Sequence, residues 1–241
     1  MRVAVLSDIH ANLEALGKVL QDLDRRHLDL VISLGDLVGY GPDPLEVVRL
    51  VRKRGIPSVM GNHELGLVDP RFLKWFNQST RESLKLTKKL LSPETLTYFQ
   101  GLKPFRLVGD CRFVHGCPPD SITTYLFEYS NLGLKELFGR MKERMAFVGH
   151  THDLILIAFD GSRVFSEPLG EGKHLLKKNW RYLINVGSVG QPRDGNNKAK
   201  YVIWDDDAQT LEVRFLPYDM ARTAEKIITL GFPESNARRL W

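Results

Sequence analysis

The 241-residue sequence has little that would point to secretion or to a membrane. Its only cysteines are Cys111 and Cys117, too few for a disulfide framework. No apolar run approaches the roughly 20 residues that a membrane-spanning helix needs. The start does not resemble a signal peptide, because Arg2 is followed at once by a strand pattern and then by Asp8. We therefore expect a cytoplasmic protein without a membrane partner.

The sequence also lacks a concentrated charge of one sign. The formal net charge is +5, but the basic residues are scattered in separate pairs and triplets. No basic stripe alternates with aromatic residues, as a stacking surface for single-stranded nucleic acid would require. Nucleic acid is therefore an unlikely partner, although the surplus positive charge can help to attract a small phosphate-bearing substrate.

What the sequence does contain is a strand, a polar loop and a helix at its beginning. Residues 2–7 include Val3, Val5 and Leu6 and predict a buried strand. Asp8 and His10 follow directly. Leucines at helical spacing from residue 13 onward predict a helix, for which Asn12 is a suitable N-cap.

The same unit recurs. A second apolar strand over residues 30–34 ends at Gly35-Asp36, and Asp43, Pro44 and Glu46 predict the start of a second helix. A short third strand over residues 58–60 leads into Gly61-Asn62-His63-Glu64. The resulting βαβαβ order predicts parallel strands, and their carboxyl ends should lie at one edge, where open α/β sheets bind ligands.

The remainder predicts a mixed architecture. Residues 70–101 read as a helical insertion of unknown role. A hairpin over residues 106–114 ends at His115, and a strand over residues 145–148 ends at Gly149-His150-Thr151-His152. Beyond this point the apolar period is mainly two, which favours antiparallel or mixed sheet up to a last helix at residues 220–230. We expect an α/β fold forming one domain over residues 1–241.

The positions of the histidines indicate a metal site. Five of the seven histidines directly follow a predicted strand, and aspartate or asparagine accompanies them. Such donors without thiolates suit Mn²⁺ best in our interpretation, with Fe, Zn²⁺, Co²⁺, Ni²⁺ or Mg²⁺ as alternatives. The number of donors fits two divalent ions that share a carboxylate, about 3.5–4 Å apart. The candidate donors lie at the ends of the predicted strands, from Asp8 near the start of the chain to His152.

These motifs, in this order, resemble the calcineurin-like metallophosphoesterase superfamily. The likeness is strongest to small prokaryotic predicted phosphodiesterases, and it extends to Gly39-Tyr40-Gly41-Pro42 and to the segment from Asn185 to Arg193. The resemblance implies two packed mixed β-sheets flanked by helices. It also implies that Asp8, His10 and His152 hold one ion, that Asp36 bridges, and that Asn62, His115 and His150 complete the second. His63 would then stabilise the transition state or protonate the leaving oxygen.

The expected reaction is hydrolysis of a phosphodiester by a metal-bridging hydroxide, with His63, Asp36 and Asn62 as catalytic residues. Arg193, Asn12 and Tyr40 are candidates for substrate contact, although Asn12 is also explained as a helix cap. The alternatives are a phosphomonoesterase, including a phosphoprotein phosphatase, and a non-catalytic scaffold that binds a protein partner. The sequence does not indicate the oligomeric state.

Overall fold

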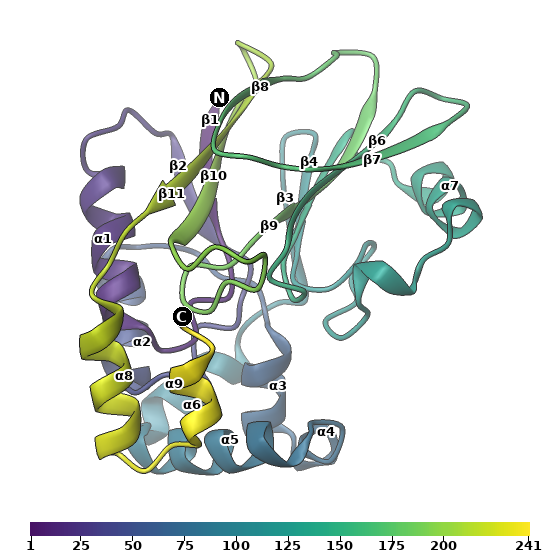
Figure 1. The fold of residues 1–241 in the computed structure, drawn as a ribbon. Helices are drawn as coiled ribbons and strands as arrows, with labels where there is room; N and C mark the ends of the chain where they lie inside the picture. Colours follow the sequence, from purple (N-terminus) through teal and green to yellow (C-terminus); the bar gives the residue numbers. More distant parts are fainter.

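The computed structural model describes residues 1–241 and contains two β-sheets packed face to face, with helices on both outer faces (Figure 1). The first sheet combines strands from both ends of the chain. Its β1 pairs in parallel with β2 and antiparallel with β10, so the amino-terminal strand lies beside a strand from the last fifth of the sequence. In spatial order the strands are β2 (Leu30–Ser33), β1 (Arg2–Leu6), β10 (Ala199–Asp205), β11 (Thr210–Leu216) and β8 (Gly172–Leu175).

The second sheet is also mixed. Its central strands β4, β5 and β9 are parallel, and the pairs of β3 with β4, β9 with β6 and β6 with β7 are antiparallel. In spatial order the strands are β3 (Phe105–Val108), β4 (Cys111–Val114), β5 (Met145–Val148), β9 (Arg181–Val186), β6 (Leu154–Phe159) and β7 (Val164–Pro168).

Strand β1 illustrates why the sheets are buried on both faces. Val3 and Val5 pack into the layer between the two sheets, where the rings of Phe113 and Phe147 stack 5.2 Å apart. The alternate residues Ala4 and Leu6 pack beneath the helices on the other face. Those helices are α1 (Leu13–Leu23) and α2 (Pro44–Lys53), and α7 (Asn131–Arg140) covers the outer face of the second sheet.

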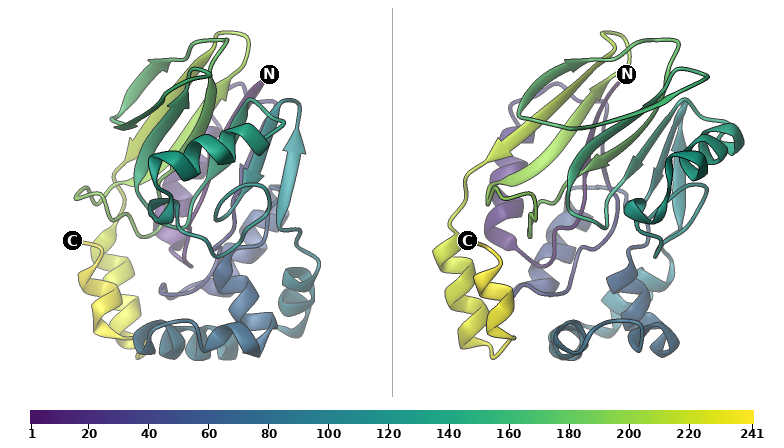
Figure 2. Two further views of the ribbon diagram at one scale, coloured as in Figure 1. Left: turned by 90° about the vertical axis from the view of Figure 1, so that its right-hand side faces the viewer. Right: turned by 45° about the vertical axis from the view of Figure 1, so that its right-hand side comes forward.

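The remaining helices gather at the end of the sandwich toward which β1 and β2 run (Figures 1 and 2). An apolar cluster of the last two helices, which includes Ile227, Phe232 and Leu240, packs against Leu86 of α5. None of the helices in the structure is long and apolar enough to cross a membrane. The helices at this end are α3 (Asn62–Val68), α4 (Pro70–Leu73), α5 (Gln78–Leu90), α6 (Pro93–Gln100), α8 (Met220–Thr229) and α9 (Glu234–Arg238).

The fold class predicted from the sequence is confirmed, because two mixed sheets flanked by helices are present. Some local predictions were wrong. The third strand at residues 58–60 is reduced to two isolated bridges, Ser33 with Ser58 and Val59 with Lys103. They connect β2, at the edge of the first sheet, to the segment just before β3 of the second. Helix α2 begins at Pro44 as predicted, but Asp43 makes no capping hydrogen bond with it, because its carboxylate pairs with Lys226 of α8 at 2.8 Å.

Candidate metal centre

The polar clusters predicted at the strand ends meet at one place. Asp8 and His10 follow β1, Asp36 follows β2, and His115 follows β4. Asn62 begins α3, so this segment is helical rather than a loop. Each of the seven candidate ligands is at most 8% exposed: Asp8, His10, Asp36, Asn62, His115, His150 and His152.

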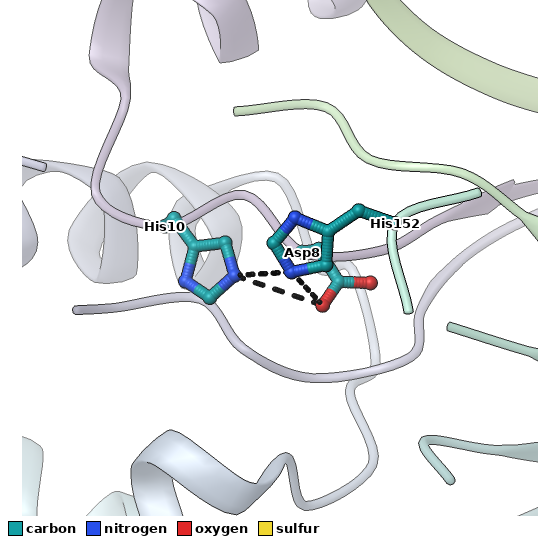
Figure 3. Close-up of side chains that lie close together, drawn as sticks. All are labelled: Asp8, His10 and His152. Atoms are coloured by element: carbon teal, nitrogen blue, oxygen red, sulfur yellow. Dashed lines mark hydrogen bonds and ion pairs between the residues drawn. The ribbon is translucent and has the colours of Figure 1, made fainter. Parts of the chain in front are cut away.

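One cluster consists of Asp8, His10 and His152 (Figure 3). The Nε2 atoms of the two histidines lie 3.0 Å apart. Asp8 Oδ1 is 3.2 Å from His152 Nε2 and 3.7 Å from His10 Nε2. Three donor atoms therefore converge on one small volume, although the side chains come from segments about 140 residues apart.

The second cluster consists of Asp36, His115 and His150, with Asn62 beside them. His115 Nε2 lies 3.4 Å from Asp36 Oδ2 and 2.9 Å from Asn62 Oδ1. The same Asp36 Oδ2 lies 3.7 Å from His10 Nε2 of the first cluster. Asp36 is therefore placed between the two clusters, where a shared ligand would be needed.

The donor set fits cations. Asp8 Oδ1 is buried and has no hydrogen-bond partner. With its amide nitrogen turned toward the second cluster, Asn62 donates to the Asp36 carboxylate at 3.0 Å and to His150 Nδ1 at 3.1 Å. With its oxygen turned there instead, it can ligate a cation. A buried carboxylate oxygen without a partner, as at Asp8, is costly, and a positive ion beside it removes that cost.

Backbone carbonyl groups orient the imidazole rings. In three of the histidines Nδ1 lies against a carbonyl oxygen, so Nδ1–H can donate and the lone pair of Nε2 faces the cluster. In His150 the arrangement is reversed, because Nε2 lies against the Thr123 carbonyl oxygen at 3.2 Å and Nδ1 faces the cluster. The other acceptors are the carbonyl oxygens of Val38 for His10, Leu34 for His115 and Gln191 for His152.

The backbone of the candidate ligands is unusual. Five of the seven have left-handed φ angles between 48° and 69°, a region that residues other than glycine rarely adopt. Each such residue costs on the order of 1–3 kcal/mol, which the surrounding structure must offset. Strain of this kind concentrates at functional sites. The five residues are Asp8, His10, Asp36, His150 and His152.

Glu64 holds the loops of the centre together, a role that the sequence did not reveal. Its fully buried carboxylate accepts hydrogen bonds from the backbone N–H groups of Asp36 (2.8 Å), Gly61 (3.0 Å) and Val38 (3.2 Å). Burial and the nearby Asp36 raise the pKa of Glu64 to about 8. The approach at Gly61 is so close that a Cβ there would lie 2.2 Å from the Asp36 nitrogen. The available signal was an acid three residues after a helix N-cap.

Burial and mutual charge set the electrostatics of the centre. Burial opposes the protonated form of His115, but Asp36 outweighs it and raises the pKa of His115 to about 9, so a cation that binds at Nε2 must displace a proton near neutral pH. Burial, reinforced by His115, lowers the pKa of His150 to about 3. Burial alone would raise the pKa of Asp36, yet His115 and His63 hold it far below its usual value. The centre thus keeps Asp36 ionised, as a metal ligand must be.

A cavity of about 310 Å³ opens over the second cluster. His63 and Tyr40 line it and their rings lie 4.7 Å apart. Arg193 lines it as well and donates from Nη2 to Gln191 at 3.1 Å. Asn12 does not line it, because its amide caps α1 at Ala15 and donates to the carbonyl oxygen of Gly190. The structure thus shows the capping role of Asn12.

Comparison with known proteins gives consistent matches. A family model described as the calcineurin-like phosphoesterase superfamily domain matches residues 1–209. An uncharacterized protein of Methanocaldococcus jannaschii is 38% identical over 99% of this chain and 97% of its own length. The crystal structure of a metallophosphoesterase from Sphaerobacter thermophilus superposes with a TM-score of 0.85 at 38% identity, covering 100% of this chain and 98% of that one. A symmetrical bis(5'-nucleosyl)-tetraphosphatase of Psychromonas ingrahamii is 32% identical over 47% of this chain and 42% of its own length.

Proposed function

The chain belongs to the calcineurin-like phosphoesterase superfamily, and from this we propose that it hydrolyses a phosphodiester with two divalent cations, Mn²⁺ in the first instance. The observation that supports the proposal best is the position of Asp36 between two groups of donors. Asp8, His10 and His152 would hold one cation, and Asn62, His115 and His150 would hold the other. Asp36 would be a ligand of both cations. Cations bound there supply an activated water near neutral pH and neutralise phosphate oxygens.

The chain's own residues would orient the substrate. Arg193, at the edge of the cavity, would pair with a non-bridging phosphate oxygen. His63 lies with a ring nitrogen 3.8 Å from Asp36 Oδ2 and would donate a hydrogen bond or a proton to the leaving oxygen. Tyr40 packs edge-on against both His10 and His63 and would fix the two rings. The burial of the ligands excludes bulk water from all but the cavity side.

We also infer that residues 1–241 act as one domain. The family match ends at residue 209, but the helices that follow are packed against α5 and α1. Helix α8 reaches the first helix through Lys226, whose amino group contacts Glu14 at 2.6 Å.

The first test compares the wild type with Asp36→Asn. We expect the Mn²⁺-loaded wild type to hydrolyse bis-p-nitrophenyl phosphate, and to do so faster than the monoester p-nitrophenyl phosphate. Asp36→Asn should lower kcat/KM by more than about 100-fold, since even the partners of metal ligands typically contribute 10–100-fold. Calorimetric titration should give two Mn²⁺ per wild-type chain and fewer in the variant.

The matched control is Asp120→Asn, which changes an exposed aspartate in the same way. It should keep both activity and stoichiometry. A wild type that binds no Mn²⁺ would overturn the proposal, and so would an Asp36→Asn protein that is as active as the control. Faster cleavage of the monoester would instead support the phosphomonoesterase alternative.

A further inference from the structure

A smaller cavity of about 90 Å³ adjoins the cavity over the metal cluster. The two share a wall, and the smaller one has almost no charged lining. Asn62 and His150, two of the candidate ligands, line both cavities. A chemical group bound in the small cavity would therefore lie next to a phosphate bound at the second metal position. The shared residues are Asn62, Trp75, Phe76, Tyr125 and His150.

One side of the small cavity is aromatic and comes from the segment after α3. Phe72, Trp75 and Phe76 line it, and the rings of Phe72 and Trp75 lie 5.7 Å apart. Trp75 is 70% exposed, so packing within the fold does not account for an indole at this position. This segment lies at the start of the predicted helical insertion, for which the sequence indicated no role.

Tyr125 and His150 also line the small cavity. Tyr125 stacks on the ring of His150 with centroids 3.9 Å apart and an angle of 17°. On its other face Tyr125 stacks on Phe127 at 4.9 Å, and Phe127 is 72% exposed. A column of three rings thus extends from the surface to a candidate metal ligand. Because both His150 and Phe127 stack on Tyr125, this ring offers an edge to the small cavity.

The larger cavity supplies the complementary charge. Arg193 and Arg239 line it from two different parts of the chain, and both are exposed. Aromatic side chains that line a cavity suit a flat ring, whereas guanidinium groups suit phosphate oxygens. The matching ligand has a flat ring at one end and phosphate at the other.

We propose that the small cavity binds the base of a nucleoside, so that the substrates are nucleotide phosphoesters whose phosphate lies at the metal centre. This inference rests on the proposed function for the position of the phosphate. Any base can stack on aromatic side chains, and this stacking is strong enough to favour nucleotides over other phosphoesters. It also gives the insertion after α3 a role, because Trp75 contributes an exposed ring to the lining of the cavity.

The test is a binding measurement with AMP and ribose 5-phosphate, which differ by the base alone. We expect the Mn²⁺-loaded wild type to bind AMP at least about tenfold more tightly by calorimetry, as one stacked base typically provides. In Trp75→Ala the ratio of the two dissociation constants should fall toward one. Trp75→Phe, which retains a ring, should keep most of the preference.

Trp241→Ala is the matched control, because Trp241 is also 70% exposed and lines neither cavity. It should keep the preference for AMP in full. Equal affinity of the wild type for AMP and ribose 5-phosphate would overturn the inference, and so would a preference that persists in Trp75→Ala.

Hydrolysis of bis-p-nitrophenyl phosphate by the same samples separates the two proposals. Activity without a preference for AMP refutes the nucleoside site and leaves the proposed function in place. A preference for AMP without activity supports the binding site and refutes the proposed function. Absence of both refutes both.

Discussion

At the scale of single residues, the centre depends on side chains that do not face the cavity. Glu64 is the clearest case, because one carboxylate joins the backbone of Asp36, Val38 and Gly61. Two of these segments supply candidate ligands, Asp36 itself and Asn62. Glu64 therefore fixes the position of Asp36 relative to Asn62, although its carboxylate need not touch a metal.

Glu64→Gln tests this role. The amide nitrogen would replace an oxygen that accepts from N–H groups, so at least one backbone donor would lose its partner. We expect Mn²⁺ affinity to fall about 10–100-fold, as is typical for partners of metal ligands. The free energy of unfolding should fall by about 1–3 kcal/mol. Calorimetric titration and urea denaturation measure these effects.

Glu46→Gln is the control for this variant, because Glu46 is exposed in the first turn of α2. Unchanged Mn²⁺ affinity in Glu64→Gln would show that Asp36 and Asn62 are positioned by other contacts.

At the scale of elements, a buried ion pair joins the strands that lead to His115 and His150. Arg112 of β4 donates from Nε and Nη2 to the carboxylate of Glu143, just before β5, at 3.0 and 2.7 Å. Arg112 also donates to the Pro119 carbonyl oxygen and lies 4.6 Å from the ring of Phe105. The pair thus ties β3, β4 and the approach to β5 together.

Removal of one partner should cost more than removal of both. Glu143→Ala leaves the Arg112 cation buried without its partner, so we expect a loss of about 3–5 kcal/mol in the free energy of unfolding. Arg112→Met combined with Glu143→Leu should lose clearly less. Urea denaturation of the three proteins at pH 7 measures the difference. Equal losses in the single and double variants would show that the pair itself contributes little.

The pH dependence of the same variants has a definite sign. Arg112 lowers the pKa of Glu143 in the folded state below its usual value near 4.5. The stabilising contribution is therefore complete above pH 4.5 and is lost as the pH falls through the lower, folded-state pKa. The difference in unfolding free energy between wild type and Glu143→Ala should shrink on acidification below pH 4.5. A constant difference down to pH 3 would contradict this assignment.

Elements with a strong apolar period were predictable and weakly patterned ones were not. The predicted strand at residues 145–148 coincides with β5, because this segment runs apolar without interruption. Strand β8 was missed, since Gly172 and Lys173 give it no apolar face and only its pairing with β11 defines it. Helix α9 has five residues, too few for a helical period.

The sequence predicted which residues form the site better than it predicted the geometry of those residues. Parallel strands bring their carboxyl ends together, and this argument placed Asp8, Asp36 and His150 in one region. Whether they bind metal stays a prediction. The left-handed backbone at these residues is imposed by the surrounding loops and has no signature in their identities. The same holds for Trp75 and Tyr125, which tertiary packing alone brings to one cavity.

At the scale of the whole molecule, the end of the chain supports the metal centre. Asn236 of α9 is fully buried and donates to the Tyr40 carbonyl oxygen at 3.0 Å and to Ser83 Oγ at 2.9 Å. It therefore connects the last helix, the loop that contains Tyr40, and α5. Helix α9 is thus part of the wall around the site.

Asn236→Ala should affect both stability and catalysis. It leaves the Tyr40 carbonyl without a partner, which we expect to cost about 1–3 kcal/mol in the free energy of unfolding. It should also lower kcat/KM toward bis-p-nitrophenyl phosphate by raising KM, since Tyr40 lines the cavity. Ser235→Ala, which removes only a contact to Ser79 at the surface, is the control. An unchanged KM in Asn236→Ala would show that the loop is held without α9.

The left-handed φ angles of Asp8, His10, Asp36, His150 and His152 have an evolutionary consequence. Glycine is the residue that adopts these angles without penalty, so the fold by itself would favour glycine at all five. Buried hydrogen bonds oppose that preference at two of them, because the backbone N–H groups of His150 and His63 donate to the carboxylates of Asp8 and Asp36. Selection for the side chains of the centre therefore acts against the backbone at these five positions.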